Sequence, residues 1–300
     1  MPSLGGATFT GDAMFKGATF AKDVEFREAR FASDARFDSV TFAGEAKFVG
    51  ARFRGDSSFI WTTFTGTAVF DSATFTNHAG FGEAMFTGDA EFDGTYFMGD
   101  AVFNKTMFTA NALFSRATFI RDAWFVEATF MGDAVFGEAT CTGPAEFGRA
   151  TFEVLTLFGP ISCTGRVDLS GTLFRAPVTI EIAAGEVLCA RTRWESTATL
   201  RLRYATVDLG GALLSSPVAV TAHPAPFTSS TTALDESLLG GHAPGVRVAS
   251  VRGVDAAHLV LTDADLSECL FSGAFHLDQL RLEGRCTFAA TPNGLHYHRI

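Results

Sequence analysis

The sequence predicts an all-β solenoid, a rod whose coils repeat one structural unit. Three observations predict it: phenylalanine is used to excess, its spacing alternates between six and five residues, and a small or β-branched residue stands two positions before each phenylalanine. The chain of 300 residues holds 32 Phe against three Tyr and three Trp. A chain that reuses one large residue in this way has one kind of interior position, repeated many times.

The spacing of the phenylalanines excludes a helical repeat. Of 28 consecutive positions from Phe9 to Phe158, 27 hold Phe and the exception is Cys141. A strict alternation of five and six drifts around a helix of 3.6 residues per turn and gives no single face. In an extended chain, positions i and i−2 point to the same side, so each Phe and the small residue before it face inward together.

The predicted interior column is represented by twelve phenylalanines of the regular part. They are Phe9, Phe20, Phe31, Phe42, Phe53, Phe64, Phe75, Phe86, Phe92, Phe103, Phe114 and Phe125.

An Ala-x-Phe-x-x module repeated head to tail resembles the Phe-centred branch of the pentapeptide-repeat proteins. Residues 264–268 read Ala-Asp-Leu-Ser-Glu and match that family's usual Ala-(Asp/Asn)-Leu-x-x motif. The resemblance implies a right-handed quadrilateral β-helix, with one module on each of four faces. Here every second module carries one additional residue, so we expect a repeat of about 22 residues per coil in the N-terminal part.

Such a coil makes a checkable prediction about unusual residues. Those that share an environment should recur at the period of the coil and so lie in stacked coils. Three pairs fit: Cys141 with Cys163, Met85 with Met107, and Arg30 with Arg52.

Changes in the spacing of the predicted inward-facing residues divide the chain into five segments. Residues 1–182 are expected to form the regular Phe-cored solenoid, 183–220 degenerate coils, 221–245 a loop excursion, 246–288 further coils, and 289–300 a C-terminal tail. The excursion is rich in Pro, Ser, Thr and Gly and has room for a short helix at 233–239. The tail shows no capping helix, which leaves two alternatives: a homodimer through an uncapped end, or a natural chain that continues past Ile300. The second is favoured.

Composition limits the partners and the cellular setting. A net charge of −10 argues against direct nucleic acid binding, because phosphate contacts need Lys and Arg. Five cysteines without a C-x-x-C pair argue against a disulfide framework or a zinc site and favour a reduced, cytoplasmic setting. We find neither a signal peptide nor an apolar run long enough for a membrane span.

A search for chemistry finds no catalytic motif, and we expect no cofactor and no enzymatic activity. His258, His276, His296 and His298 cluster late in the chain, where exposed histidines are a better interpretation than a metal site. For Cys141 and Cys163, a small apolar filler is favoured over a disulfide. Any catalytic site would have to lie in 221–245.

An acidic residue recurs at multiples of eleven in a Gly-Asp-Ala element. We favour a structural role, in which Asp caps the backbone of a corner through local hydrogen bonds, as Asp and Asn do in turns. The alternative is an acidic interaction face, since residues 71–146 hold eleven Asp and Glu against three Lys and Arg. Its candidate residues are Asp89, Glu91, Asp93, Asp100, Asp122 and Asp133.

Two functions follow from these features. The first is a non-catalytic structural or protein-interaction scaffold, since rigid solenoids offer long contiguous surfaces to a protein partner. The second comes from the resemblance: some pentapeptide-repeat proteins are acidic mimics of DNA that bind the type II topoisomerase DNA gyrase.

Overall fold

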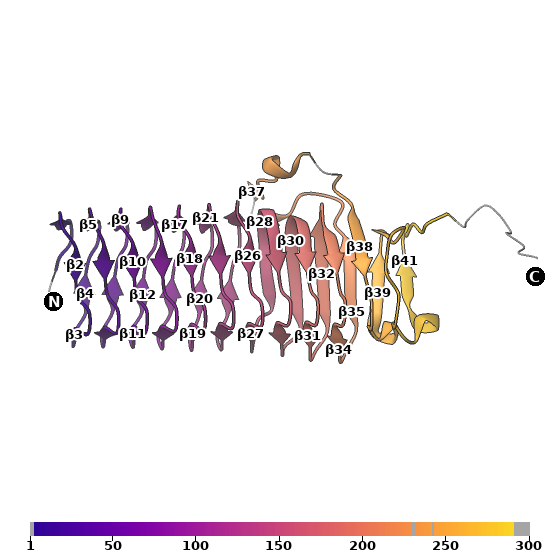
Figure 1. Cartoon of the computed structure of the whole chain (residues 1–300), viewed down its shortest axis with the longest axis horizontal. Coiled ribbons are helices and arrows are strands. Elements are labelled where there is room, and N and C mark those ends of the chain that lie inside the picture. Colours follow the sequence, from indigo (N-terminus) through magenta and orange to yellow (C-terminus); the bar gives the residue numbers. More distant parts are fainter. Residues whose placement is uncertain (1–2, 230–231, 242, 291–300) are drawn as a thin grey trace, which may run out of the picture.

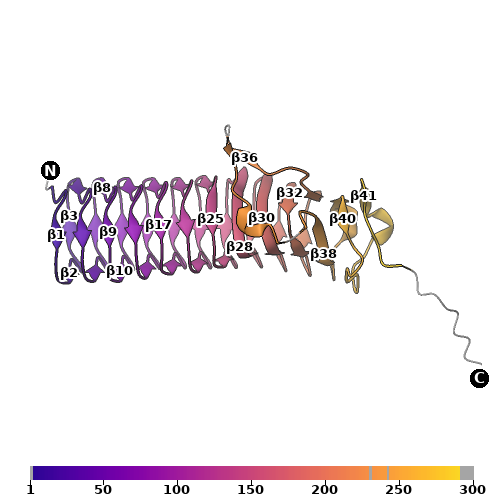
Figure 2. The same cartoon turned by 90° about the horizontal axis from the view of Figure 1, so that it is seen from above.

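The chain folds into one long rod of stacked coils. The computed structural model describes residues 3–229, 232–241 and 243–290. These residues are nearly all β, in a solenoid of about 12 turns with roughly 22 residues per coil. Figure 1 shows the coils in sequence order along the axis, and Figure 2 shows the same straight stack from above. The predicted fold class is confirmed.

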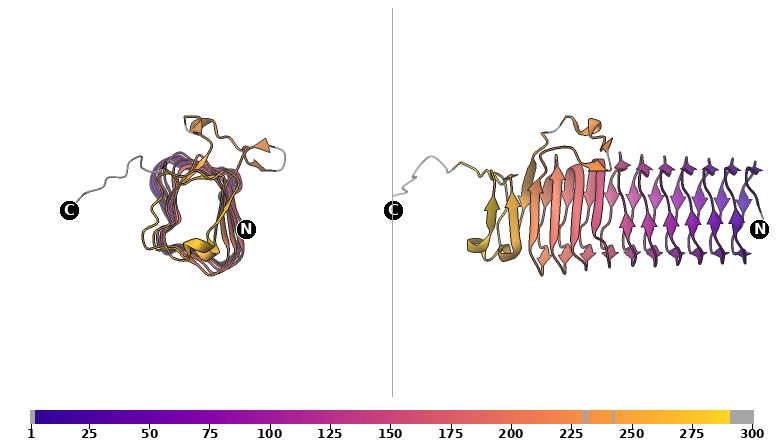
Figure 3. Two further views of the ribbon diagram at one scale, coloured as in Figure 1. Left: turned by 90° about the vertical axis from the view of Figure 1, so that its right-hand side faces the viewer. Right: turned by 180° about the vertical axis from the view of Figure 1, so that it is seen from behind.

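Each coil has four faces, and each face pairs in parallel with the coil before and after it. Phe9 pairs with Phe31 and Phe20 with Phe42, in each case one coil further along the chain. Viewed along the axis, the coils superimpose on a closed, four-sided outline (Figure 3). We number the faces in chain order and name each corner by the two faces it joins.

The strands of the regular part are mostly two residues long. Face 1 holds β1 (Thr8–Phe9), β5 (Arg30–Phe31), β9 (Arg52–Phe53), β13 (Thr74–Phe75), β17 (Tyr96–Phe97), β21 (Thr118–Phe119) and β25 (Ala139–Cys141). Face 2 holds β2 (Ala13–Met14), β6 (Ala35–Arg36), β10 (Ser57–Ser58), β14 (Ala79–Gly80), β18 (Ala101–Val102), β22 (Ala123–Trp124) and β26 (Ala145–Glu146). Face 3 holds β3 (Thr19–Phe20), β7 (Thr41–Phe42), β11 (Thr63–Phe64), β15 (Met85–Phe86), β19 (Met107–Phe108), β23 (Thr129–Phe130), β27 (Thr151–Phe152), β29 (Leu173–Phe174), β31 (Arg193–Trp194) and β34 (Leu213–Leu214). Face 4 holds β4 (Val24–Glu25), β8 (Ala46–Lys47), β12 (Ala68–Val69), β16 (Ala90–Glu91), β20 (Ala112–Leu113) and β24 (Ala134–Val135).

The interior consists of four stacks of phenylalanine rings, one from each face. Phe92 is fully buried and stacks on Phe70 and Phe114, with ring centroids 4.9 and 4.8 Å away and nearly parallel planes. Phe81 and Phe103 of the face-2 stack meet it edge-on at 5.4 Å. The inter-strand spacing of about 4.8 Å is therefore also a favourable distance for aromatic stacking.

The twelve phenylalanines chosen from the sequence are distributed over all four stacks. Ten of them are fully buried, and Phe9 and Phe20 are partly exposed because they lie in the first coil. The three predicted pairs are direct register partners: Cys141 with Cys163, Met85 with Met107, and Arg30 with Arg52.

Two opposite corners turn through a residue in the left-handed region. Glu28 at corner 4/1 and Ser39 at corner 2/3 have φ of 55° and 56°, and the pattern recurs with the period of the sequence repeat. The other corners stack backbone on backbone. At corner 3/4, a Cβ on Gly88 would lie 2.6 Å from the carbonyl carbon of Gly66, so this close approach requires glycine.

The coil becomes two positions shorter in the region of Ile180 to Val187. Phe158 pairs with Ile180 at the longer period, whereas Val167 pairs with Val187 at the shorter one. One position is lost at corner 4/1 and one at corner 1/2, beside the boundary that the sequence placed at 182. The coils of residues 183–220 then keep the shorter register, in which Val178 pairs with Ala198 and Ala198 with Val218.

Loss of a corner joins the short strands into long ones. The longest are β28 (Leu157–Asp168) and β30 (Val178–Leu188). The strands that follow are β32 (Ala198–Arg203), β33 (Thr206–Asp208), β35 (Val218–Ala222), β38 (Val246–Ser250), β39 (Leu259–Thr262), β40 (Ala264–Asp265) and β41 (Arg281–Glu283). Two single turns of 3-10 helix, η2 (Ala256–His258) and η3 (Leu277–Gln279), lie in the last coils.

Residues 223–245 leave the solenoid and return to it. They form a small antiparallel hairpin of β36 (Thr228–Ser229) and β37 (Thr232–Ala233), followed by η1 (Ser237–Leu239). A 3-10 turn thus stands where the sequence left room for a short helix. Figure 3 shows this inserted segment outside the four-sided outline, and Figure 1 shows it above β28 and β30.

Candidate interaction surfaces

Four of the six acidic residues chosen from the sequence lie around face 4. Asp89 and Asp133 occupy corner 3/4, Glu91 points outward from β16, and Asp93 sits at corner 4/1. Asp93 forms an ion pair with Arg116 of the next coil.

Asp100 and Asp122 lie at corner 1/2, on the opposite side of the coil. The six residues therefore do not form one acidic face. The eleven-residue recurrence of Asp divides them, because half a coil separates one member from the next.

Several of the recurrent acids accept hydrogen bonds from the next coil rather than from their own turn. Asp23 Oδ1 accepts from the backbone N–H of Glu45 at 2.9 Å, and Asp89 Oδ1 accepts from that of Asn111 at 3.1 Å. Asn111 continues the series, since its Oδ1 accepts from the N–H of Asp133 at 3.2 Å. These bonds tie successive coils together at corner 3/4. These acids thus have a structural role, but their hydrogen bonds join successive coils instead of closing a local turn.

On face 4, burial and the negative charge of neighbouring carboxylates both raise the pKa of a carboxyl group. Burial raises the pKa of the Glu91 carboxyl above its ordinary value, and the neighbouring Asp71, Asp89 and Glu45 raise it further. The pKa of Asp71 is also raised, chiefly by burial. The acids of this face repel one another and are held together by the backbone that carries them.

A group of large apolar side chains is exposed around corner 1/2, in two adjacent coils. We call Tyr96, Met98, Ile120 and Trp124 the corner patch; their exposed fractions are 38, 42, 37 and 40%. Met98 and Ile120 occupy equivalent positions in successive coils, and Trp124 lies beside Val102 in the face-2 sheet. Asp100 and Asp122 stand within the patch. Among the described residues, neither carboxylate has a hydrogen bond or an ion pair.

Sequence reasoning missed the corner patch, although the period of the coil could have found it. The positions equivalent to Met98 and Ile120 in other coils hold Thr10, Ala32, Arg54, Thr76 and Thr142. Two apolar residues at consecutive turns of an otherwise polar or small column therefore stand out once the coils are aligned.

Comparison with protein families agrees with this geometry. A family model described as pentapeptide repeats (9 copies) matches residues 4–52, 48–96 and 103–151. This part of the chain consists of pentapeptide repeats. The matched residues fall within the longer, Phe-cored coils, so the pentapeptide-repeat part and the Phe-cored part coincide. No curated protein and no solved structure matches the chain significantly.

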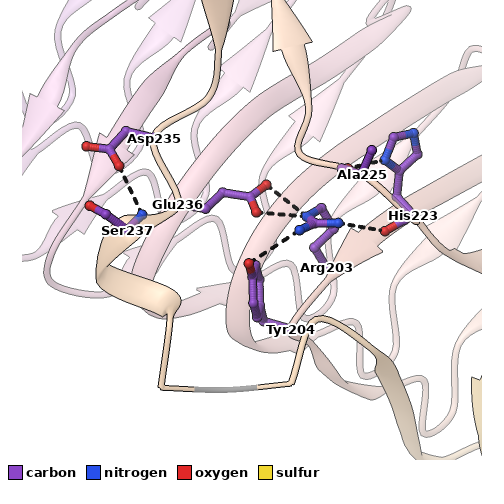
Figure 4. A network of polar contacts seen from close by, with 7 residues as sticks. All are labelled: Arg203, Tyr204, His223, Ala225, Asp235, Glu236 and Ser237. Carbon is purple, nitrogen blue, oxygen red and sulfur yellow. Dashed lines mark hydrogen bonds and ion pairs between the residues drawn. The ribbon is translucent and has the colours of Figure 1, made fainter.

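A buried ion pair anchors the inserted segment to the coils that follow the pentapeptide repeats (Figure 4). Arg203, at the end of β32, donates from Nε to both carboxylate oxygens of Glu236 at 2.9 and 2.8 Å, and both side chains are almost fully buried. The same guanidinium donates to the carbonyl of His223 at 2.9 Å and to the Tyr204 hydroxyl at 3.3 Å. Three parts of the chain thus meet at one side chain.

Apolar contacts complete this anchor. Phe227, Leu234 and Leu239 of the inserted segment are buried against Ala183 of β30 and against Tyr204. No sequence pattern predicted the Arg203–Glu236 ion pair, because each residue is an ordinary charged residue and 33 positions separate the two.

A hollow of about 440 Å³ lies at the base of the inserted segment, where Tyr204, Gly245 and Asp265 are among its lining residues. Its carboxylates are already engaged by the protein. Asp263 accepts from the N–H of Arg285 at 2.8 Å, and Asp265 accepts from the N–H of Ser267 and the hydroxyl of Thr287, both at 2.9 Å. These bonds, the one from Ser267 foremost, lower the pKa of Asp265. A carboxylate with a lowered pKa is a poor general base.

The histidines and cysteines do not converge on a metal site within the described part of the chain. His276 Nδ1 lies 2.8 Å from the Asp255 carboxylate, and His296 and His298 fall outside the described residues. Cys141 and Cys163 are free, buried thiols. A hydrogen bond with Cys163, together with burial, raises the pKa of the Cys141 thiol, as expected of an inert filler. In residues 3–229, 232–241 and 243–290, no helix is long and apolar enough to cross a membrane.

Proposed function

We propose that this chain is a non-catalytic protein-interaction scaffold that binds its partner through the corner patch. One observation carries the proposal: four large apolar side chains, two of them aromatic, are exposed around corner 1/2 in two adjacent coils. Exposed apolar groups that are contiguous mark interaction sites more often than single ones do. Tyr and Trp are also enriched among the residues that dominate binding energy.

The chemistry of the patch describes the partner. Asp100 and Asp122 place two carboxylates without a partner in the described structure among the apolar side chains, with the Arg121 guanidinium between them in sequence. A partner surface with aliphatic or aromatic side chains and at least one Lys or Arg would complement this arrangement. Each coil fixes its neighbours through backbone hydrogen bonds, so the patch is presented in one geometry at little entropic cost.

Affinity isolation from cells of the source organism tests the proposal. The immobilised wild-type chain should retain a specific polypeptide, and the double variant Met98→Ser/Trp124→Ser should lose it. Leu213→Ser is the matched control, because Leu213 is 56% exposed on face 3 and lies outside the patch. Retention by the double variant, or equal loss with the control, would contradict the proposal.

The acidic mimic of DNA is the alternative function. The net charge of residues 71–146 favours it, but the acids lie at opposite corners and apolar groups interrupt them. A DNA gyrase supercoiling assay with the added chain distinguishes the two: inhibition at micromolar concentration would favour the mimic, and its absence the scaffold.

Three further expectations stay predictions. They are the lack of enzymatic activity, the cytoplasmic location, and the homodimer through an uncapped end. Light scattering of the purified chain would decide the oligomeric state.

A further inference from the structure

Three arginines surround a small hollow on face 1 near the first coils. Arg30 and Arg52 are direct register partners on adjacent strands, and Arg54 follows two residues later at corner 1/2. With Thr8, Phe31 and Ala32 they line a hollow of about 130 Å³. The methyl group of Ala32 leaves space where Arg54 stands one coil later.

The arrangement differs from that of three other basic residues in these coils, which are paired, although Lys16 and Lys22 form no ion pair within the described residues. Each of the three forms an ion pair with an acid two residues earlier on the same coil: Arg27 with Glu25, Arg36 with Asp34, and Lys47 with Glu45. Arg52 and Arg54 instead flank Phe53, so each has a like charge at that spacing. Among the described residues, Arg30, Arg52 and Arg54 form no ion pair.

Like charges directly opposite each other on adjacent strands are destabilising. Here the strand spacing of about 4.8 Å fixes Arg30 beside Arg52, and no carboxylate lines the hollow. In a chain of net charge −10, such a concentration of positive charge is a local exception. A bound anion would remove the repulsion and use the free guanidinium donors.

We propose that Arg30, Arg52 and Arg54 bind the phosphoryl group of a phosphate monoester. Guanidinium groups match tetrahedral oxyanions with paired, charge-assisted hydrogen bonds, and three of them suit a dianion. The hollow has the volume of about four water molecules, at ~30 Å³ each, which is room for one such group. The acidic remainder of the rod would repel a nucleic acid backbone, so the ligand carries an isolated phosphoryl group. This inference is independent of the corner patch, which lies further along the rod.

Titration of inorganic phosphate into the full chain, followed by ³¹P NMR at low ionic strength, tests the proposal. We expect saturable binding that is tighter at pH 8 than at pH 5, because the second pKa of phosphoryl groups is about 6. Arg52→Gln and Arg54→Gln should each weaken binding by about tenfold or more, and the double variant should abolish it. Arg36→Gln is the matched control and should bind as the wild type does, because Arg36 lies on face 2 of the coil that holds Arg30 and is paired with Asp34.

Two further ligands identify the source of the phosphoryl group. Glycerol phosphate represents a free metabolite, and a phosphoserine peptide represents a modified protein; tighter binding of either supports the proposal and names the source. The mutated side chains are exposed, so thermal unfolding should be unchanged and should confirm that each variant is folded. Absence of saturable binding in the wild type, or equal binding in the double variant, would overturn the proposal.

Discussion

The two halves of the rod use the same four faces with different interiors. From Phe9 to Phe158 the core is almost entirely phenylalanine, and each coil has roughly 22 residues. From Ile180 onward the core is mostly aliphatic, with Leu200 and Val220 in place of rings, and the coil is two positions shorter. Aliphatic side chains fill less volume than stacked rings, so a close-packed interior needs a shorter perimeter.

The corner between faces 4 and 1 is one of the places where the coil becomes shorter. In the Phe-cored coils this corner turns through a left-handed residue, the last being Glu138 in the column that includes Glu28. In the shorter coils Ile180, Glu181 and Ile182 continue as one strand. Corner 2/3 keeps its left-handed residue in both halves, at Arg149 and again at Arg191. Corner 4/1 is therefore lost beside the change from rings to aliphatic side chains, whereas corner 2/3 is retained in both halves.

Replacing a core phenylalanine should have the largest effect on stability and tests the difference between the two interiors. Phe92→Ala should cost about 3–5 kcal/mol of unfolding free energy, because Phe92 contacts rings of its own and of adjacent stacks. Leu200→Ala in the second half should cost less, near the lower end of the range of about 2–5 kcal/mol for an aliphatic truncation. Denaturant unfolding of both variants measures the difference. A loss below about 1 kcal/mol at Phe92 would contradict an interior held by stacked rings.

The buried ion pair belongs to the second half, where it holds the inserted segment. Arg203→Met should destabilise this segment by about 3 kcal/mol, because it leaves the Glu236 carboxylate buried without a cation. Hydrogen exchange should accelerate at residues 223–229 and stay slow in the Phe-cored coils. The double variant Arg203→Met/Glu236→Leu should recover much of the loss, because it removes both charges. Unchanged exchange in the single variant would show that the apolar contacts alone hold the segment.

The hydrogen bonds between coils give a third, smaller effect within the first half. Asp89→Ala should cost about 1 kcal/mol, because it removes the acceptor for the N–H of Asn111. Asp100→Ala is the matched control at the equivalent repeat position, and should stay within about 0.5 kcal/mol because its carboxylate has no hydrogen bond among the described residues. Equal costs for the two variants would mean that the carboxylates act in some other way than by these bonds.

The smallest effect concerns the charge of face 4. A carboxyl whose folded pKa is raised destabilises the folded state above that pKa, and the penalty disappears once pH falls below the unfolded value, here 4.5. Glu91→Gln should therefore stabilise the chain at pH 7 by about 0.3 kcal/mol, after allowance for solvent screening. The gain should vanish below pH 4. Thermal unfolding at pH 7 and pH 3.5 measures both values, and a loss of stability at pH 7 would refute the interpretation.

The period of the sequence predicted most of the fold. Because one residue type marks each inward position, counting from Phe9 gave the coil length and the pairing of Arg30 with Arg52. The second half was harder to predict, because Ile, Leu, Cys and Trp share the inward positions and no single type marks them. Trp194 shows the difficulty: it continues the stack of Phe174, but with its ring centroid 6.2 Å away.

The candidate surfaces were less predictable than the core. Their residues point outward, where the repeat places no constraint on residue type, so Tyr96 and Trp124 break no rule of the fold. The Arg203–Glu236 pair depends on how residues 223–245 return to the rod, which local sequence does not specify. Asp89, Asp100, Asp122 and Asp133 were found easily because they recur at multiples of eleven residues, as the core positions do.

The recurrence of both core and corners twice in every Phe-cored coil has a consequence for how this chain can change length. Deleting one whole coil would leave every downstream side chain at the same azimuth and move it about 4.8 Å along the axis. Deleting half a coil would still superimpose Phe on Phe and left-handed corner on left-handed corner, yet it would rotate everything downstream by half a turn. The arginine hollow and the corner patch, now on the same side, would then face in opposite directions. One short deletion would thus separate the two proposed binding surfaces without disturbing the packing of either.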